Sequence, residues 1–181
     1  MTTPYFKPHE LDGVSTSDLA TIRQRHARRW EALIRKECKR LKKVEVAFVD
    51  KNWEAPKVPG QKIRVETSKP DFSGHLADGR HVVFEAKTTL HPTRFDFSNI
   101  SKGQRQHLDY ADTCGAMAFV YLLDNMRRRW VLPWWFVLSM ESVCEKSSFP
   151  LPESPHFNTN DSSFQKKNKE TWVDTYRRVS R

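Results

Sequence analysis

The sequence predicts an α/β domain in which a mixed β-sheet is flanked by helices. Apolar residues recur at helical spacing between Leu19 and Leu41, which predicts a long amphipathic helix. Two strand-like segments flank Asp78-Gly79, a residue pair typical of a hairpin connection. Residues 116–123 form a continuous apolar run, as in a strand that is buried on both faces. These patterns indicate the fold class, although unrelated folds share the same order of elements.

The other elements follow from local signals. Ser15 or Ser17 caps the first helix, and Pro133 can occupy the first turn of a short helix rich in aromatic residues. Phe95 and Phe97 are expected to pack inside the protein, since exposing both would be unfavourable. We expect further strands over residues 44–49, 61–66 and 129–132, and helices over residues 98–112 and within 166–181.

The chain of 181 residues is long enough for one domain with a single core. We expect a flexible N-terminal arm over residues 1–14, a folded domain over 15–146 and a C-terminal extension with a basic tail over 147–181. The N-terminus lacks an apolar segment of signal-peptide length, and no run approaches about 18 apolar residues. The three cysteines are far apart, which excludes the usual zinc spacings and suits a reducing compartment. We therefore expect a cytoplasmic protein without a membrane span.

The candidate site depends on the turn between two predicted strands, residues 69–76 and 81–88. A two-residue turn would pair position 72 with position 85, and Asp71 and Glu85 would then lie on opposite faces of the sheet. A three-residue loop with Gly79 in the left-handed conformation pairs position 71 with position 85. The two carboxylates then stand side by side, as the candidate site requires.

Two adjacent carboxylates and one ammonium group form a site for a hard divalent cation and a positioned lysine. Lys87 shares a face with Glu85 because strand side chains alternate with period two. Mg²⁺ takes one or two protein carboxylates and completes its shell with water and substrate phosphate. An exposed hairpin with a surface Glu-Lys pair is the alternative interpretation. Against that alternative, the opposite face of the second strand is wholly apolar, with Val82, Phe84 and Ala86.

The charge of the chain favours a polyanionic partner. Lys and Arg number 31 against 22 acids, which gives a net charge of +9. Residues 23–43 hold ten basic residues and only two acids, and further basic clusters lie at 127–129 and 166–181. Each cluster taken alone could equally be a solvated charged face. Beside a site suited to phosphoryl transfer they favour DNA, and the side chains expected to bind it are Arg25, Arg28, Arg29, Lys51 and Arg94.

Pro70-Asp71 followed by Glu85-Ala86-Lys87 resembles the PD-(D/E)xK nuclease superfamily. A longer pattern resembles the RecU family of Holliday-junction resolvases, in which D-Y-x-G, F-E-A-K, N-I or N-F, and H-Q-x-x-H follow one another. The matching segments here are Asp71-Phe72-Ser73-Gly74, Phe84-Glu85-Ala86-Lys87-Thr88, Asn99-Ile100 and Gln104-Arg105-Gln106-His107-Leu108. The similarity extends over about residues 30–123.

This resemblance implies a restriction-endonuclease-like core over residues 15–146 and a homodimeric endonuclease that uses Mg²⁺ or Mn²⁺ to cut four-way DNA junctions. Asp71 and Glu85 match the metal-binding acids of the family, and Lys87 matches its catalytic lysine. Gln104 matches the family glutamine on the following helix, and Glu31 matches a third acid on the first helix. In the resulting hypothesis Gln104 contacts the water or the scissile phosphate, and the carbonyl of Ala86 is an extra metal ligand.

Several alternatives stay open. Gln104 also completes a capping-box pattern with Ser101, and Glu31 could be a surface residue that pairs with Arg35. The segment over residues 52–68 is shorter than the stalk of the family, which puts the preference for junctions in doubt more than the chemistry. A repair, restriction or phage-type nuclease for flaps, single strands or duplex DNA is therefore the second interpretation. A basic DNA-binding protein without activity is the third.

Overall fold

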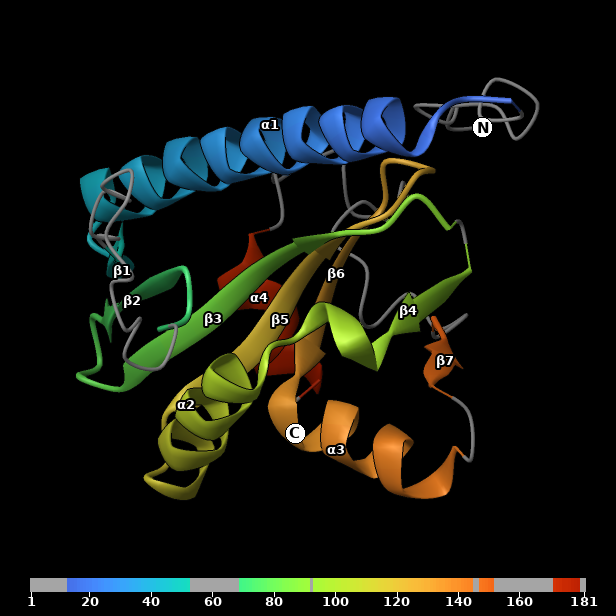
Figure 1. Ribbon diagram of the computed structural model, residues 1–181. Coiled ribbons are helices and arrows are strands. Elements are labelled where there is room, and N and C mark those ends of the chain that lie inside the picture. Colours follow the sequence, from blue (N-terminus) through green and yellow to red (C-terminus); the bar gives the residue numbers. More distant parts are fainter. Residues whose placement is uncertain (1–12, 53–68, 92, 145–146, 152–170, 180–181) are drawn as a thin grey trace, which may run out of the picture.

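The computed structural model describes residues 13–52, 69–91, 93–144, 147–151 and 171–179 (Figure 1). Its strands form a five-stranded sheet in the order β1-β2-β3-β5-β6, in which β3 and β5 are parallel and the other neighbours antiparallel. The elements are α1 (Thr16–Lys43), β1 (Ala47–Lys51), β2 (Phe72–Leu76), β3 (His81–Thr88), β4 (Arg94–Asp96), η2 (Phe97–Asn99), α2 (Lys102–Thr113), β5 (Met117–Leu123), β6 (Arg129–Pro133), α3 (Trp134–Val143), β7 (Ser148–Pro150) and α4 (Trp172–Val179).

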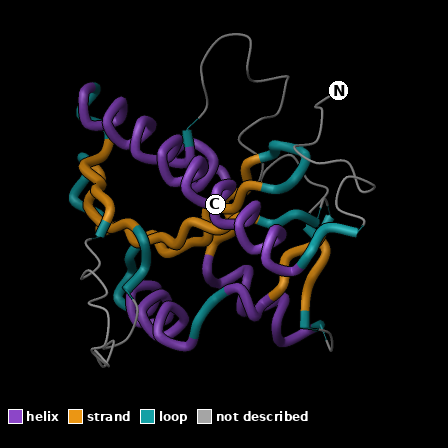
Figure 2. Tube along the Cα trace, turned by 45° about the horizontal axis from the view of Figure 1, so that its top comes forward, coloured by secondary structure: helices purple, strands orange, loops and turns teal. Residues whose placement is uncertain are grey.

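Helices cover both faces of this sheet, which confirms the predicted fold class (Figure 2). The core on one face joins α1 and α4 to the sheet and is rich in aromatic residues, among them Trp30, Phe84, Phe119 and Trp172. The core on the other face joins α2 and α3 to the same strands, with Leu108 and Trp134 fully buried. Every residue of β5 is buried, as its continuous apolar run predicts.

The long first helix has the start and the buried stripe that the sequence predicts. The Ser15 hydroxyl accepts a hydrogen bond from the Asp18 backbone N–H at 3.2 Å, so Ser15 is the N-cap. The indole N–H of Trp30 donates to the carbonyl of Tyr121 at 2.9 Å, which anchors the helix on the central strand β5. At the other end of the core, the backbone N–H of Trp172 donates to Glu37 at 3.1 Å and ties α4 to α1.

The hairpin between β2 and β3 has the three-residue loop. The Leu76 N–H donates to the carbonyl of Arg80 at 2.9 Å, and Phe72 pairs with Phe84. Gly79 has a φ of 86°, the left-handed conformation that the loop requires. Continuing this register by one residue places Asp71 opposite Glu85, as predicted.

Other boundaries differ from the sequence predictions. The first strand begins at Ala47 rather than residue 44, because Val44 is still the C-cap of α1. The second helix begins after Ser101 rather than at Ser98, because residues 97–99 form a 3₁₀ turn before the cap. The strand predicted over residues 61–66 lies outside the described residues.

A small second sheet escaped the sequence analysis. Strand β4 pairs with β7, more than 50 positions along the chain, and Phe95 lies opposite Phe149. Phe95, Phe97 and Phe149 are all buried there, so the prediction that the first two pack inside the protein is confirmed. This pairing holds the segment between β3 and α2 against α3.

Gly74 explains why a glycine stands inside β2. A Cβ at this position would collide with the carbonyl oxygen of Phe48 and lie 2.7 Å from the Cα of Val49, both backbone atoms of β1. The close approach of the two strands therefore requires a residue without a side chain.

We expect Gly74→Ala to destabilise the protein more than Gly79→Ala, its control on the same hairpin. A Cβ at Gly79 meets no atom within 4 Å. The control variant should therefore lose only the stability that an alanine in the left-handed conformation costs, about 1–2 kcal/mol. Urea unfolding measures both losses. Equal losses in the two variants would contradict the close packing of β1 on Gly74.

A candidate carboxylate and lysine site

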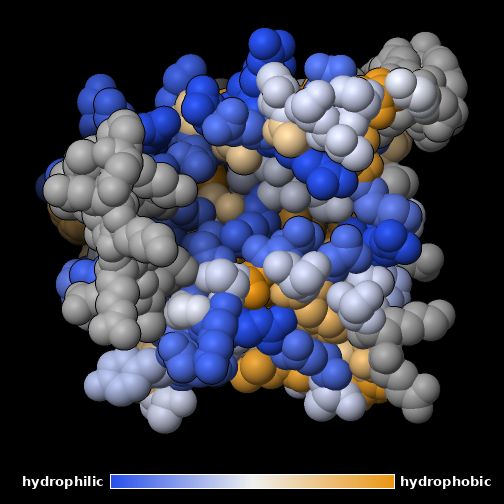
Figure 3. Space-filling model, in the orientation of Figure 1, coloured by the Kyte–Doolittle hydropathy of each residue, from blue (hydrophilic) through white to orange (hydrophobic). Residues whose placement is uncertain are grey.

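A groove of about 1190 Å³ runs between α1 and the second half of β3. The loop that leads to α2, the start of α2 and the β5–β6 connection complete its lining. On the face shown in Figure 3, hydrophilic side chains gather below α1. Asp71, Glu85, Lys87, Gln104 and Glu31 all line this groove, so the structure brings the five predicted catalytic residues together.

Asp71 and Glu85 are joined by reciprocal hydrogen bonds across the hairpin. The backbone N–H of Asp71 donates to Oε2 of Glu85 at 3.0 Å, and the backbone N–H of Ala86 donates to Oδ2 of Asp71 at 3.0 Å. Each carboxylate is therefore held by the backbone of the opposite strand. This exchange is available only when positions 71 and 85 are paired.

Glu85 is the centre of the site. Its side chain is 2% exposed, and Nζ of Lys87 lies 2.9 Å from its Oε1. The amide nitrogen of Gln104 donates to the same oxygen. The ammonium group of Lys87 also donates to Oε1 of Gln104 at 3.3 Å, so the three side chains form a closed triangle.

Burial raises the pKa of both carboxyl groups. The pKa of Glu85 rises to about 8, chiefly because burial disfavours its charged form and secondly because of the charge on Asp71. The pKa of Asp71 is also raised, first by burial, while the N–H of Ala86 counteracts this. Two buried carboxyl groups in contact favour a shared proton, or a cation in its place.

Gln104 forms the capping box considered for it and also contacts Glu85. Its Oε1 accepts from the Ser101 backbone N–H at 3.0 Å, and the Ser101 hydroxyl accepts from the Gln104 N–H at 3.3 Å, which together form a capping box. The remaining amide nitrogen is directed to Glu85. The start of α2 is thereby fixed relative to the carboxylates.

Glu31 faces the carboxylates from α1. It pairs with Lys51 at the end of β1 rather than with Arg35, the partner considered from the sequence. Its charge contributes to the raised pKa of Asp71, which places it within electrostatic reach of the site. The described residues nevertheless contain no group of three or more His, Cys, Asp or Glu side chains arranged to hold a metal ion by themselves.

Asn52 was missed by the sequence analysis. Its side-chain amide donates to the carbonyl of Pro70 at 2.7 Å and accepts from the Ser73 hydroxyl at 2.7 Å. Its backbone N–H donates to the carbonyl of Asp71 at 2.7 Å. Asn52 thus clamps the chain on both sides of Asp71. An asparagine beyond the strand predicted over residues 44–49 carries no signal for this contact, which depends on the register of β1 against β2.

The five basic residues expected to bind DNA occupy different positions. Arg25, Arg28 and Arg29 are exposed on α1. Lys51 is half-buried and engaged with Glu31, and Arg94 lines the groove, with its Nε 3.6 Å from Asp96. Along the parts of the chain that the structure describes, no helix is long and apolar enough to cross a membrane.

The donor set fits a hard divalent cation of the Mg²⁺ type. Two carboxylates and one carbonyl are within the range of ligands that Mg²⁺ takes from proteins, the remainder being water and phosphate. Asp71 and Glu85 supply the carboxylates, and Ala86 lines the groove beside them. The raised pKa values support this assignment, because a bound cation would offset the charge that burial disfavours.

The chain resembles known proteins in sequence and in fold. A family model described as "RecU: Recombination protein U" matches residues 19–151. Among solved structures, the chain is similar to Archaeoglobus fulgidus Hjc, described as a Holliday junction resolvase from an archaeal hyperthermophile. The sequence identity is 20%, the TM-score is 0.43, and the match covers 69% of this chain and 87% of that one. No curated protein matches the chain.

The stability of the metal-free protein should depend on pH through Glu85. Its pKa is 4.5 ordinarily and about 8 in the folded protein, so the folded state binds this proton more tightly than the unfolded chain. This contribution to the free energy of unfolding should be present in full below pH 4.5 and lost as the pH rises through about 8. Urea unfolding in EDTA measures it. Glu85→Gln should flatten the profile, and an unchanged profile in this variant would contradict the assignment.

We expect Asn52→Ala to weaken Mn²⁺ binding, because Asp71 loses the clamp on both of its sides. The loss of two hydrogen bonds to partly buried groups should also cost about 1–3 kcal/mol of stability. Thr175→Ala, at a buried hydroxyl on α4, is the control for instability alone. Mn²⁺ titration followed by electron paramagnetic resonance compares the two. The same Mn²⁺ affinity in Asn52→Ala as in the wild type would reject the positioning role.

Proposed function

The chain belongs to the RecU family, recombination protein U, and on this premise we propose that it is a Holliday-junction resolvase. It is a metal-dependent endonuclease that hydrolyses phosphodiester bonds in four-way DNA junctions. One observation carries the proposal beyond the family match. Asp71, Glu85, Lys87 and Gln104 converge in one groove, joined by direct hydrogen bonds or ion pairs.

We assign the metal to Asp71, Glu85 and the carbonyl of Ala86, with Mg²⁺ or Mn²⁺ as the ion. When bound, such a cation lowers the pKa of a water ligand and offsets the charge that develops on the phosphate. Asp71 and Glu85 enter this role preorganised, because the backbone of the opposite strand holds each of them.

Lys87 and Gln104 act on the reacting groups. The Lys87 ammonium group lies at the wall of the groove, where it can hold the attacking water or stabilise the developing charge. Gln104 keeps Lys87 and Glu85 in a fixed arrangement and contacts the water or the scissile phosphate. Glu31 forms the outer acidic group, balanced by Lys51 in the DNA-free protein.

The wider assignments belong to the same proposal. Arg25, Arg28 and Arg29 contact junction phosphates from α1, and Lys51 and Arg94 do so beside the groove. A twofold homodimer presents two equivalent sites, which matches the two strands that a resolvase must cut. The nuclease domain of this proposal covers residues 15–146, and β7 and α4, from the segment predicted as a C-terminal extension, pack onto it. A cytoplasmic location is supported by the three cysteines, all of which are free thiols.

A cleavage panel with four-way, flap, duplex and single-stranded DNA, with and without Mg²⁺, tests the substrate. Preferential, symmetric and Mg²⁺-dependent cutting of the four-way junction is the expected result. A monomer that cuts linear duplex equally well would assign the protein to the general nucleases. Binding without any cutting would assign it to the inactive DNA-binding proteins.

Substitutions at the site should separate cleavage from binding. Asp71→Asn and Glu85→Gln should abolish cleavage and leave junction affinity unchanged or higher, because each removes a negative charge facing phosphate. Lys87→Ala should lose cleavage but retain Mn²⁺ affinity, since an ammonium group is not a metal ligand. Gel-based cleavage assays and fluorescence anisotropy measure the two effects. Normal cutting rates in either carboxylate variant would overturn the assignment.

A further inference from the structure

The groove extends far beyond the carboxylates. Along the second half of β3 and the three residues after it, the groove is lined continuously from Glu85 to His91, at most about 20 Å of extended chain. Along α1 it is lined from Leu19 to Glu31, about 18 Å of helix. Glu31 lies near Asp71, at the end of the groove that holds the two carboxylates. Leu19, at the other end of the lining part of α1, therefore lies at the opposite end of the groove. The carboxylates therefore occupy one end of a long trough.

The lining of the groove favours an unpaired strand over a double helix. The base faces are stacked on one another inside a duplex, whereas a separated strand exposes them to apolar and planar side chains. The groove is about 20 Å long and has a volume of about 1190 Å³. A short unpaired segment is the form of DNA whose bases can reach this lining.

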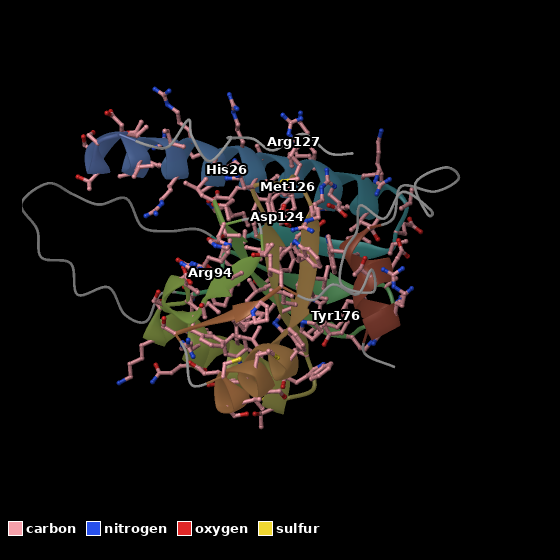
Figure 4. All side chains as sticks on the ribbon, turned by 90° about the vertical axis from the view of Figure 1, so that its right-hand side faces the viewer. His26, Arg94, Asp124, Met126, Arg127 and Tyr176 are labelled. Carbon is pink, nitrogen blue, oxygen red and sulfur yellow. The ribbon has the colours of Figure 1, made fainter. Side chains whose placement is uncertain are left out.

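The end remote from the carboxylates combines the side chains that bind single-stranded nucleic acid. Apolar and amide groups there suit base faces and edges, and two guanidinium groups suit the backbone phosphates. Figure 4 shows two of the lining residues, Met126 and Arg94, which come from different parts of the chain. The remote end is lined by Leu19, Leu90 and Met126, by Gln24 and Asn125, and by Arg23 and Arg94.

His91 supplies a planar ring held in place at this end. Its Nδ1 accepts the backbone N–H of Thr93 at 3.2 Å, so the neutral ring carries its proton on Nε2. Its own backbone N–H donates to the Thr89 hydroxyl at 3.1 Å. Thr89 is itself buried, which anchors the start of this loop. A base can stack on an imidazole ring fixed in this way.

We propose that the trough binds one DNA strand separated from its complement, on one side only of the phosphate that is cut. The inference rests on the proposed function and specifies the state of the substrate at that site. The nucleotides beside the scissile phosphate leave the base stack and lie along β3, with bases against His91 and Met126 and phosphates toward Arg23 and Arg94. Strand separation at a branch point then becomes part of substrate selection.

Junctions that carry 2-aminopurine test the proposal, because this base fluoresces more strongly when it is unstacked. The probe is placed singly at successive positions on both sides of the mapped cut, and cleavage is prevented with EDTA. Anisotropy on the same samples establishes that the junction is bound. Emission should rise several-fold on binding at positions on one side of the cut and stay unchanged on the other.

Variants at the remote end should lose this signal. His91→Ala and Met126→Ala, each checked for its melting temperature, should remove most of the rise. Tyr110→Ala, which alters an exposed residue that does not line the groove, should preserve it. A bound junction with no rise, an equal rise on both sides, or a full rise in both variants would overturn the inference while leaving the resolvase function intact. A wild-type protein that neither binds nor cuts junctions would overturn both.

Discussion

Two hydrogen bonds across the β2–β3 hairpin determine where both carboxylates lie. One runs from the Asp71 N–H to Glu85, and the other from the Ala86 N–H to Asp71. Each acid receives an N–H from the opposite strand, and this is available in one register only. Gly79 sets that register through its left-handed conformation, and Gly74 allows β1 to approach closely. Asn52 then holds the chain around Asp71 from β1. Two glycines and one asparagine thus support the site without taking part in its chemistry.

The site retains an electrostatic conflict that the fold only partly resolves. Glu85 is almost completely buried beside the carboxyl group of Asp71. Ionising both carboxyl groups is unfavourable, because burial disfavours each charge and the two charges repel each other. Lys87, Gln104 and backbone N–H groups offset part of this cost, yet the pKa of each carboxyl stays raised. The two buried carboxyl groups lower the stability of the metal-free protein. A bound cation would offset their negative charge, which makes the same arrangement suited to binding a metal. Perturbed carboxyl groups in a groove are typical of functional sites.

The apolar framework gives the groove its shape. Trp30 attaches α1 to β5 through its indole N–H, and the aromatic core beneath it packs the helix against the sheet. The β4–β7 pair holds the loop on the opposite wall, where Phe95 and Phe149 are buried. Both walls of the trough are therefore parts of packed cores. Packed walls keep the shape of the groove fixed, so the side chains that line it hold defined positions.

Local patterns in the sequence were sufficient to predict α1, the hairpin, the buried strand β5 and the carboxylate–lysine set, whereas the choice between a two-residue and a three-residue loop was left open. Each of these depends on spacing within a single element or across one tight turn, where periodicity dictates which side chains share a face. The capping box at Gln104, one of the two alternatives considered, could be recognised for the same reason.

Only the tertiary structure decided the contacts between distant segments. The pairing of Glu31 with Lys51 rather than Arg35, the clamp of Asn52 on Asp71, and the burial of Phe95 against Phe149 join elements that are separate in the chain. Their partners are chosen by how helices and strands pack, and no local spacing encodes that packing. The shape of the groove arises in the same way, because its walls come from α1 and from the segment between β3 and α2, which are far apart in the chain.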